Sequence, residues 1–248
     1  MQTAFQCKQF RVADSDCAMK VGTDSLLLGA WSPLPEQGPY LDIGTGSGLL
    51  ALMIAQRSAA FVSAPQVDAI EIDPDAARQA QQNTLASPWS TRIRVLERNI
   101  LTYPASADHA AVASCGGYSL FISNPPYFVE SLASPDPKRQ QARHSDSLPF
   151  TELLAVCAAL ASDTATFCLI LPVTSAELLL AQEPSFGWHL TLQQAVKATP
   201  AKDASRLLLQ LSRQATAHRE LEPLLIRDHR QDYSPEYRQL LRDFYLRF

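Results

Sequence analysis

Three alternate glycines mark the first stretch of the sequence that could bind a ligand. Gly44, Gly46 and Gly48 follow an apolar stretch that contains Asp42, and they precede an apolar run from Leu49. Glycine lacks a Cβ atom, so the backbone can turn tightly here and a ligand can lie against its amides. A helix starting at Leu49 would point unpaired N–H groups at the same place. The pattern predicts a nucleotide-type site after a parallel strand, with the Asp42 carboxylate facing the crevice.

The spacing of the glycines narrows the kind of ligand. A dinucleotide fingerprint, G-x-G-x-x-G, needs glycine where Leu49 stands, which disfavours an NAD-dependent oxidoreductase. An anionic pyrophosphate binds bare amides, whereas an acid such as Asp42 suits the ammonium group of a methionine moiety. The spacing resembles motif I of the S-adenosylmethionine-dependent methyltransferases. An ordinary glycine-rich turn is the alternative for this stretch taken alone.

Two polar residues follow the next two predicted strands. Glu71 lies a little more than twenty residues past the glycines, where an acid hydrogen-bonds ribose hydroxyls in nucleotide-binding folds. A solvated acid at a strand end is the alternative. Asp73 precedes Pro74 and is expected to cap a helix. Asn99 stands where many methyltransferases have an acid that binds the cofactor adenine, and its amide oxygen can still accept one hydrogen bond.

The second stretch whose residues could take part in a reaction is Asn124-Pro125-Pro126-Tyr127-Phe128. Two consecutive prolines fix φ and hold Asn124 in an extended conformation, so the turn is rigid. The Asn amide and a proline carbonyl then supply two acceptors beside an aromatic ring. Such a group would bind the two hydrogens of a planar –NH₂ group while the ring stacks on its substrate.

A basic stretch follows this turn. Lys138, Arg139, Arg143 and His144 form the densest group of basic residues in the chain. Such a run often forms a solvated surface. Its position after the amine-binding turn favours contact with nucleic-acid phosphates instead.

Composition limits the broad class of protein. The 248 residues are 46% hydrophobic, enough to fill the core of one large α/β domain. The net charge of −4 does not by itself indicate a nucleic-acid partner. Five cysteines without C-x-x-C spacing suggest reduced thiols in a cytosolic protein and no zinc site. No leader and no apolar run of transmembrane length stand out, so we expect a cytoplasmic protein without a membrane partner.

The remaining pattern predicts an α/β fold in a single domain over 1–248. Its likeness to Rossmann-like methyltransferases implies a mostly parallel, seven-stranded sheet with helices on both faces. Residues 1–31 form a hairpin and helix extension, with Thr23 or Asp24 as the helix cap, and 40–248 form the core. Residues 102–117 are expected to form an exposed loop. Strands are expected at about 5–12, 41–43, 67–73, 93–98, 118–123, 166–171, 188–197 and 206–212, the last two as an antiparallel pair. Helices are expected at about 26–31, 49–57, 74–86, 150–161, 176–183 and 235–246.

Over most of its length the sequence resembles the bacterial tRNA-valine adenine N6-methyltransferases, which modify adenine 37 beside the anticodon. The resemblance rests on the stretch 19–31, on the two central motifs at 41–57 and 124–128, and on the tail stretches 233–237 and 243–245. The sequence departs from the family pattern in two places. Asn99 replaces the usual acid, and the segment 200–203 is divergent.

The resemblance implies a class I methyltransferase fold, S-adenosylmethionine as cofactor and an anticodon-loop adenine of tRNA as substrate. We expect a monomer and no metal. The residues predicted to bind the cofactor are Lys20, Thr23, Asp24, Asp42, Gly44, Gly46, Gly48, Glu71, Ile72, Asp73, Asn99 and Asn124. The predicted catalytic residues are Asn124, Pro125, Pro126 and Tyr127. The residues predicted to bind the substrate are Tyr127, Phe128, Lys138, Arg139, Arg143 and His144.

Other methyl acceptors remain open, because the same turn suits a protein glutamine amide or the N2 amine of guanine in RNA. A non-catalytic cofactor-binding module is a further alternative. Its expected mark is a disrupted Asn-Pro-Pro-Tyr turn, and this turn is intact.

Overall fold

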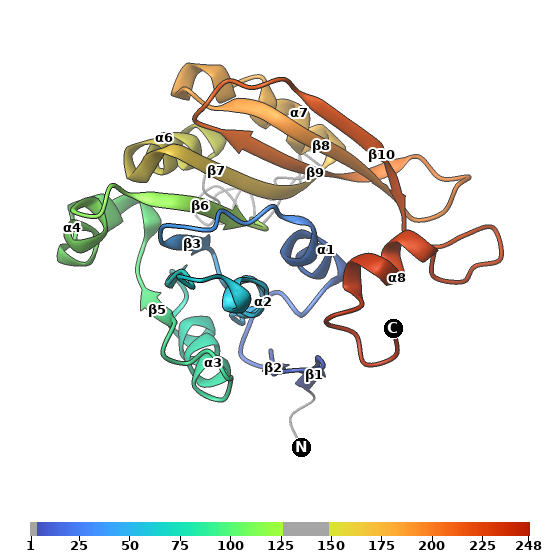
Figure 1. Cartoon of the computed structure of the whole chain (residues 1–248), viewed down its shortest axis with the longest axis horizontal. Helices are drawn as coiled ribbons and strands as arrows, with labels where there is room; N and C mark the ends of the chain where they lie inside the picture. Colours follow the sequence, from blue (N-terminus) through green and yellow to red (C-terminus); the bar gives the residue numbers. More distant parts are fainter. Residues whose placement is uncertain (1–3, 126–148) are drawn as a thin grey trace, which may run out of the picture.

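A computed structural model describes residues 4–125 and 149–248 of the chain. An eight-stranded sheet runs through it, in the order β10-β8-β9-β7-β6-β3-β4-β5 (Figure 1). Five strands are mutually parallel, as expected for a Rossmann-like fold. They are β3 (Tyr40–Ile43), β4 (Val67–Glu71), β5 (Ile93–Glu97), β6 (Tyr118–Ser123) and β7 (Ala161–Pro172).

The far edge of the sheet contains the strands that complete it. β8 (His189–Lys197) and β9 (Ala204–Ser212) form the predicted antiparallel pair, and β9 also pairs antiparallel with β7. β10 (Arg219–Leu225) adds to β8 in parallel. The described part of the chain therefore has eight strands in this sheet where we predicted seven. β10 was missed because its sequence, RELEPLL, has no clear alternation and contains a proline, which is tolerated at a sheet edge.

Helices cover both faces of the sheet and bury two separate cores. One core contains the buried residues of α1 (Thr23–Trp31) and α2 (Leu49–Arg57), and α8 (Pro235–Leu241) packs there as well. The other contains residues of α6 (Phe150–Leu160) and α7 (Val173–Leu180). Neighbouring strand residues alternate between the two, since Leu120 belongs to the first core and Phe121 to the second. This alternation explains why the central strands read as continuous apolar runs.

The chain before α1 forms the predicted hairpin, β1 (Ala4–Gln6) with β2 (Arg11–Ala13). It lies against the C-terminal end of the chain, because the backbone N–H of Lys8 donates to the Phe244 carbonyl. The prediction that Thr23 or Asp24 caps the following helix is wrong. The helix already includes both residues, and Gly22 is its N-cap without a side-chain bond.

Two other expectations differ from the structure. Residues 102–117 are largely helical, with a 3-10 segment η2 (Ile100–Ala105) and α4 (Ala107–Ala113), because the Ser106 hydroxyl caps α4 by accepting from the His109 N–H. The last helix ends at Leu241, short of residue 246. The remaining elements are α3 (Pro74–Leu85), η1 (Ser58–Ala60) and η3 (Glu183–Phe186). No helix within 4–125 and 149–248 is both long and apolar enough to cross a membrane.

Candidate active site

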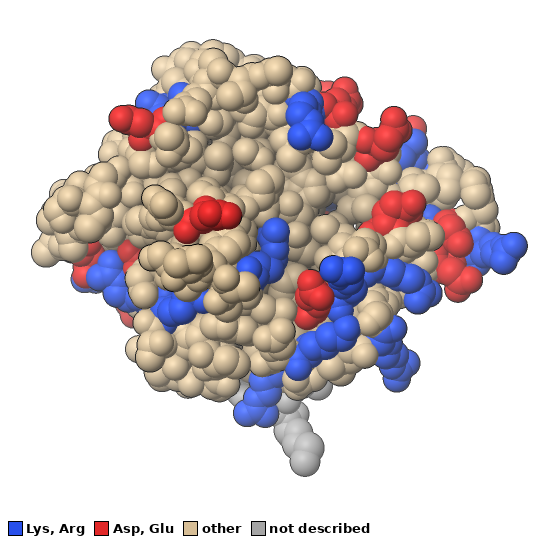
Figure 2. Space-filling model, viewed as in Figure 1, with Lys and Arg blue, Asp and Glu red and all other residues tan. Residues whose placement is uncertain are grey.

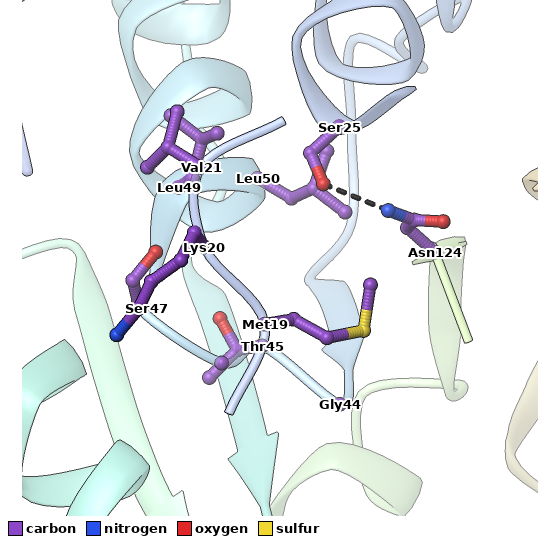
Figure 3. Close-up of a pocket in the computed structure, with 11 residues that line it drawn as sticks. Met19, Lys20, Val21, Ser25, Gly44, Thr45, Ser47, Leu49, Leu50 and Asn124 are labelled. Carbon is purple, nitrogen blue, oxygen red and sulfur yellow. Dashed lines mark hydrogen bonds between the residues drawn. The ribbon is translucent and has the colours of Figure 1, made fainter. Parts of the chain in front are cut away.

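A cleft opens where the glycine turn faces the start of α1 and the end of β6 (Figure 3). It is partly open to solvent. Parallel strands end together at one edge of a sheet, and this is where ligands bind in such folds. The residues that line the cleft are Met19, Lys20, Val21, Ser25, Gly44, Thr45, Gly46, Ser47, Leu49, Leu50 and Asn124.

The three glycines of the turn serve two purposes. All three have positive φ, with values of 68° at Gly44, 55° at Gly46 and 83° at Gly48. A Cβ atom at Gly44 or Gly46 would meet nothing within 4 Å among the described residues, so these two leave space for a close-lying ligand. A Cβ atom at Gly48 would come within 3.4 Å of Ala80 in α3. Gly48 does not line the cleft, and its contribution is to the packing of the helices.

Asp42 lies beneath the turn and does not face the crevice. Its side chain is fully buried, and its Oδ2 atom accepts from the Thr45 hydroxyl at 2.5 Å and from the Ala51 N–H at 3.0 Å. Its Oδ1 atom has no hydrogen-bond partner within the described part of the chain. Desolvation raises the pKa of Asp42 to about 7, and the nearby charge of Glu71 adds to this. Asp42 thus fixes the turn and α2, while a contact with cofactor remains a prediction.

Glu71 joins the end of β4 to the glycine turn. Its Oε2 atom accepts from the Gly46 N–H at 2.8 Å, while Oε1 accepts from the N–H groups of Ile72 at 2.9 Å and Asp73 at 3.0 Å. The acid is therefore held at the turn by three backbone donors. Asp73 caps α3, as predicted, by accepting from the N–H groups of Asp75 and Ala76.

Exposed apolar side chains follow the ends of the neighbouring strands β4 and β5. Ile72 is 66% exposed and Leu101 is 40% exposed. Asn99 uses its amide oxygen to accept from the Leu101 N–H at 2.9 Å and so caps η2. Ile72 was predicted as a cofactor residue, and its contact with cofactor remains a prediction.

Of the residues predicted near the start of α1, one lines the cleft and two do not. Lys20 lines the cleft, but its ammonium donates to the carbonyls of Asp14, Ser15 and Cys17 at 2.6, 3.1 and 3.0 Å. These bonds fold the preceding loop against the cleft. Thr23 is exposed and does not line the cleft.

Asp24, the next predicted residue, points toward the start of β9. It forms an ion pair with Arg206 of β9, with 2.8 Å between Arg206 Nε and Asp24 Oδ2. Like Thr23, it does not line the cleft. Any contact of either residue with cofactor therefore remains a prediction.

Asn124 is the predicted catalytic residue that the structure places in the cleft. Its amide Nδ2 donates to the Ser25 hydroxyl at 2.9 Å, a contact between residues 99 positions apart (Figure 3). Pro125 follows it and is buried. Seven predicted residues lie outside the described ranges, and their roles remain predictions: Pro126, Tyr127, Phe128, Lys138, Arg139, Arg143 and His144.

Several lining residues were not predicted from the sequence. Thr45, Ser47, Leu49 and Leu50 surround the glycines, so they lie at the cleft for the same local reason. Met19, Val21 and Ser25 come from a segment that reaches the cleft only through folding. Their sequence signal is the stretch 19–31 that carries the family resemblance, in which Met19 and Val21 flank Lys20 and Ser25 follows Asp24.

A solved structure shares this arrangement of elements. A chain from Agrobacterium tumefaciens, described as a predicted O-methyltransferase, superposes with a TM-score of 0.65 at 19% identity. The alignment covers 89% of this chain and 96% of the other. At this identity the likeness shows the fold. With the glycine turn at the carboxyl ends of the parallel strands, it defines the class as a Rossmann-like α/β protein.

Sequence relatives define the family within that class. A protein of Tolumonas auensis named tRNA1(Val) (adenine(37)-N6)-methyltransferase is 45% identical over 98% of this chain and 97% of its own length. A protein of Erwinia tasmaniensis with the same name is 41% identical over 98% of this chain and 94% of its own length. No protein-family model matches the sequence. The chain belongs to the tRNA1(Val) (adenine(37)-N6)-methyltransferase family.

Proposed function

We propose that this chain transfers a methyl group from S-adenosylmethionine to N6 of an adenine in tRNA, namely adenine 37 of a valine tRNA. One observation carries the proposal. A single cleft contains both the glycine turn that suits a nucleoside cofactor and the Asn124 amide that suits an exocyclic amine. Proximity of the two reactants in one cleft is the largest contribution such a site can make to the rate.

The residues around the turn fit S-adenosylmethionine. Open space above Gly44 and Gly46 gives a ligand access to their backbone, and Glu71 lies where ribose hydroxyls could replace the Gly46 N–H as donors. Ile72 and Leu101 offer exposed apolar surface suited to a flat adenine ring. When bound, the cofactor supplies an electrophilic methyl group on a sulfonium.

The amine side of the cleft stabilises charge without a titratable base. The N6 lone pair of adenine is delocalised into the ring, so the amine is a weak nucleophile. We propose that the Asn124 Oδ1 atom and the Pro125 carbonyl accept its two hydrogens. These bonds favour a pyramidal nitrogen and stabilise the positive charge that develops on it, and the methylated nitrogen loses one proton to water after the transfer. Tyr127 is proposed to stack on a flipped-out base, as loop bases are commonly read.

Contacts with the body of the RNA require basic side chains that face its phosphates. Figure 2 shows Lys and Arg side chains around α8 and the C-terminal end, with Asp and Glu among them, so this face is not one continuous basic patch. We propose that the phosphate contacts come from the basic stretch with Lys138, Arg139, Arg143 and His144. We propose further that the chain acts as a cytoplasmic monomer.

Methyl transfer from labelled S-adenosylmethionine to total tRNA, followed by nucleoside analysis, tests the proposal. Label should appear as N6-methyladenosine. Asn124→Ala should lower kcat by about 10²–10³-fold, the usual effect of removing one transition-state hydrogen bond. Cofactor affinity, measured by calorimetry, should change little.

Gln239→Ala is the matched control, because it removes an exposed side-chain amide from α8. It should leave the rate unchanged. Label found as N2-methylguanosine, or in a protein glutamine, would keep the methyltransferase class and overturn the adenine assignment.

A further inference from the structure

Asn124 is held from its nitrogen side by a residue on a distant helix. Its Nδ2 atom donates to Ser25 Oγ at 2.9 Å, and Figure 3 shows the amide oxygen on the side away from Ser25. Ser25 belongs to the first turn of α1, while Asn124 follows the last residue of β6. Both residues line the same cleft.

Both ends of this contact are fixed by the fold. Ser123, beside Asn124, donates its hydroxyl to the Ile43 carbonyl at 2.8 Å and ties the end of β6 to β3. Asp24, beside Ser25, pairs with Arg206 at 2.8 Å, and Leu26 on its other side is buried. The distance between Ser25 and Asn124 is therefore set by secondary-structure elements rather than by a flexible loop.

An asparagine amide needs such a contact because its two ends have similar size and opposite polarity. The terminal torsion of Asn is broad and roughly two-fold, so sterics alone do not select one orientation. An amine hydrogen must meet the oxygen, since the –NH₂ end offers only donors. A flipped amide would present a donor to a donor.

We propose that Ser25 is a positioning residue, which accepts from Asn124 Nδ2 and so turns Oδ1 toward the methyl-accepting amine. The inference rests on the proposed function for the identity of that amine. Ser25 acts through Asn124 and does not itself touch the reacting atoms. A hydroxyl at this position is required, whereas the rest of the side chain is not.

The first test compares Ser25→Ala with Ser25→Thr. Alanine removes the acceptor, and kcat for tRNA methylation should fall about tenfold, the effect of one hydrogen bond of ordinary net strength. KM for tRNA and the affinity for S-adenosylmethionine should stay within twofold. Ser25→Thr keeps the hydroxyl and should restore most of kcat. Alanine favours the helix more than serine does, so the loss cannot be attributed to unfolding of α1.

The second test repeats Ser25→Ala in an Asn124→Asp background. A carboxylate has two equivalent oxygens, so its orientation no longer matters and the second substitution should change kcat less than twofold. An equal tenfold loss in both backgrounds would show that Ser25 acts by another route and would overturn the inference. A fall in cofactor affinity with kcat unchanged would do the same, because it would make Ser25 a cofactor ligand.

A third measurement separates this inference from the proposed function. The Asn124 side-chain Nδ2 hydrogens, observed by ¹⁵N NMR and assigned by their loss in Asn124→Asp, should shift and exchange faster in Ser25→Ala. Methylation of RNA by the unaltered chain is scored separately. If no RNA is methylated while the NMR change occurs, the proposed substrate fails and the positioning contact stands. Unchanged Nδ2 signals in Ser25→Ala would reject the contact whatever the substrate.

Discussion

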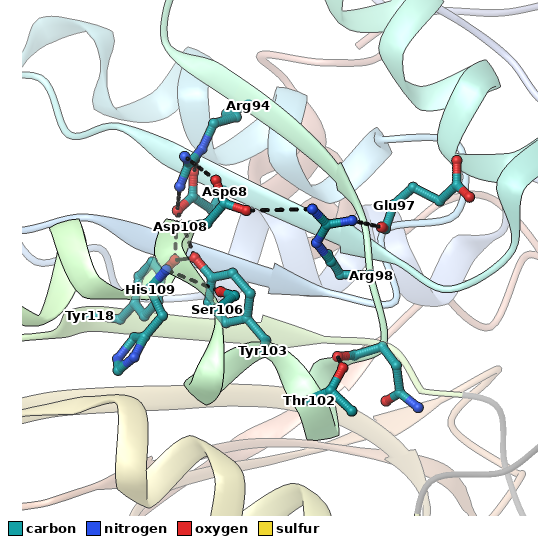
Figure 4. A network of polar contacts seen from close by, with 11 residues as sticks. Asp68, Arg94, Glu97, Arg98, Thr102, Tyr103, Ser106, Asp108, His109 and Tyr118 are labelled. Atoms are coloured by element: carbon teal, nitrogen blue, oxygen red, sulfur yellow. Dashed lines mark hydrogen bonds and ion pairs between the residues drawn. The ribbon is translucent and has the colours of Figure 1, made fainter.

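The two ends of the parallel strands use buried carboxylates in opposite ways. At the carboxyl end, Asp42 keeps one oxygen without a partner in the described part of the chain, and burial raises its pKa to about 7. Toward the amino end, Asp68 is saturated: Arg94 donates to its two oxygens at 2.8 and 2.9 Å, and Tyr118 donates at 2.5 Å (Figure 4). Tyr103 then bonds Tyr118 at 2.7 Å and extends the network.

The difference distinguishes a site that can bind a ligand from a hydrogen-bond network that only supports the fold. Around Asp68 each partner is already supplied by the fold, so the network can hold strands and η2 together but offers nothing to a ligand. Around Asp42 the turn has open space and, within the described part of the chain, a buried oxygen without a partner, which costs stability. Such a cost is typical of functional sites, where local rules are broken for the sake of function.

The largest effect that this contrast predicts is on stability. Asp68→Ala should lower the free energy of unfolding by about 2–3 kcal/mol, because it removes the acceptor of the buried Tyr118 hydroxyl and one of the two acidic partners of Arg94, which keeps Asp108. Urea unfolding measures this. Activity per folded molecule should be unchanged. Arg78→Ala is the control, since its ion pair with Asp75 is exposed on both sides and should contribute less than about 1 kcal/mol. Equal losses in the two variants would contradict the supporting role of Asp68.

A second prediction concerns pH and Asp42. Its folded pKa of about 7 lies above the ordinary value of 3.8, so the folded chain binds more protons between these values. Stability should therefore fall as pH rises from about 4 to 7, by about 1 kcal/mol per pH unit from this group.

Asp42→Asn cannot ionise, and the corresponding part of the slope should vanish. Urea unfolding at several pH values gives the comparison, with Asp75→Asn as an exposed control. An unaltered slope in Asp42→Asn would mean that Asp42 does not titrate in this range.

The smallest effect on stability should come from Gly46→Ala. A Cβ atom meets nothing within 4 Å among the described residues, so the cost is that of a positive φ, about 1–2 kcal/mol. The same methyl would project into the space that a ligand needs. Affinity for S-adenosylmethionine, measured by calorimetry, should therefore fall more than tenfold. Gly116→Ala is the control, because it also has positive φ and open surroundings but lies away from the cleft. If both variants kept full affinity, the turn would not be the cofactor site.

Local patterns predicted the elements whose signals are contiguous. The helix at 49–57 and the cap at Asp73 were confirmed, because apolar spacing and a residue before proline are local features. The family was also predicted correctly, since its motifs can be read in order along the chain. β10 was missed because its place is set by β8, and Ser106 as the cap of α4 was missed in a stretch that was expected to be a loop.

The sequence by itself determined the glycine turn, the strand that leads to Asn124 and the family to which the chain belongs. These depend on backbone conformations and residue spacings within a few positions, which local chemistry dictates. Only the tertiary structure decided which groups meet. It buried Asp42 beneath the turn, saturated Asp68 and brought Ser25 to within 2.9 Å of Asn124 across 99 residues. Such contacts follow from the packing of α1 and β6 into one fold, and no local pattern specifies them.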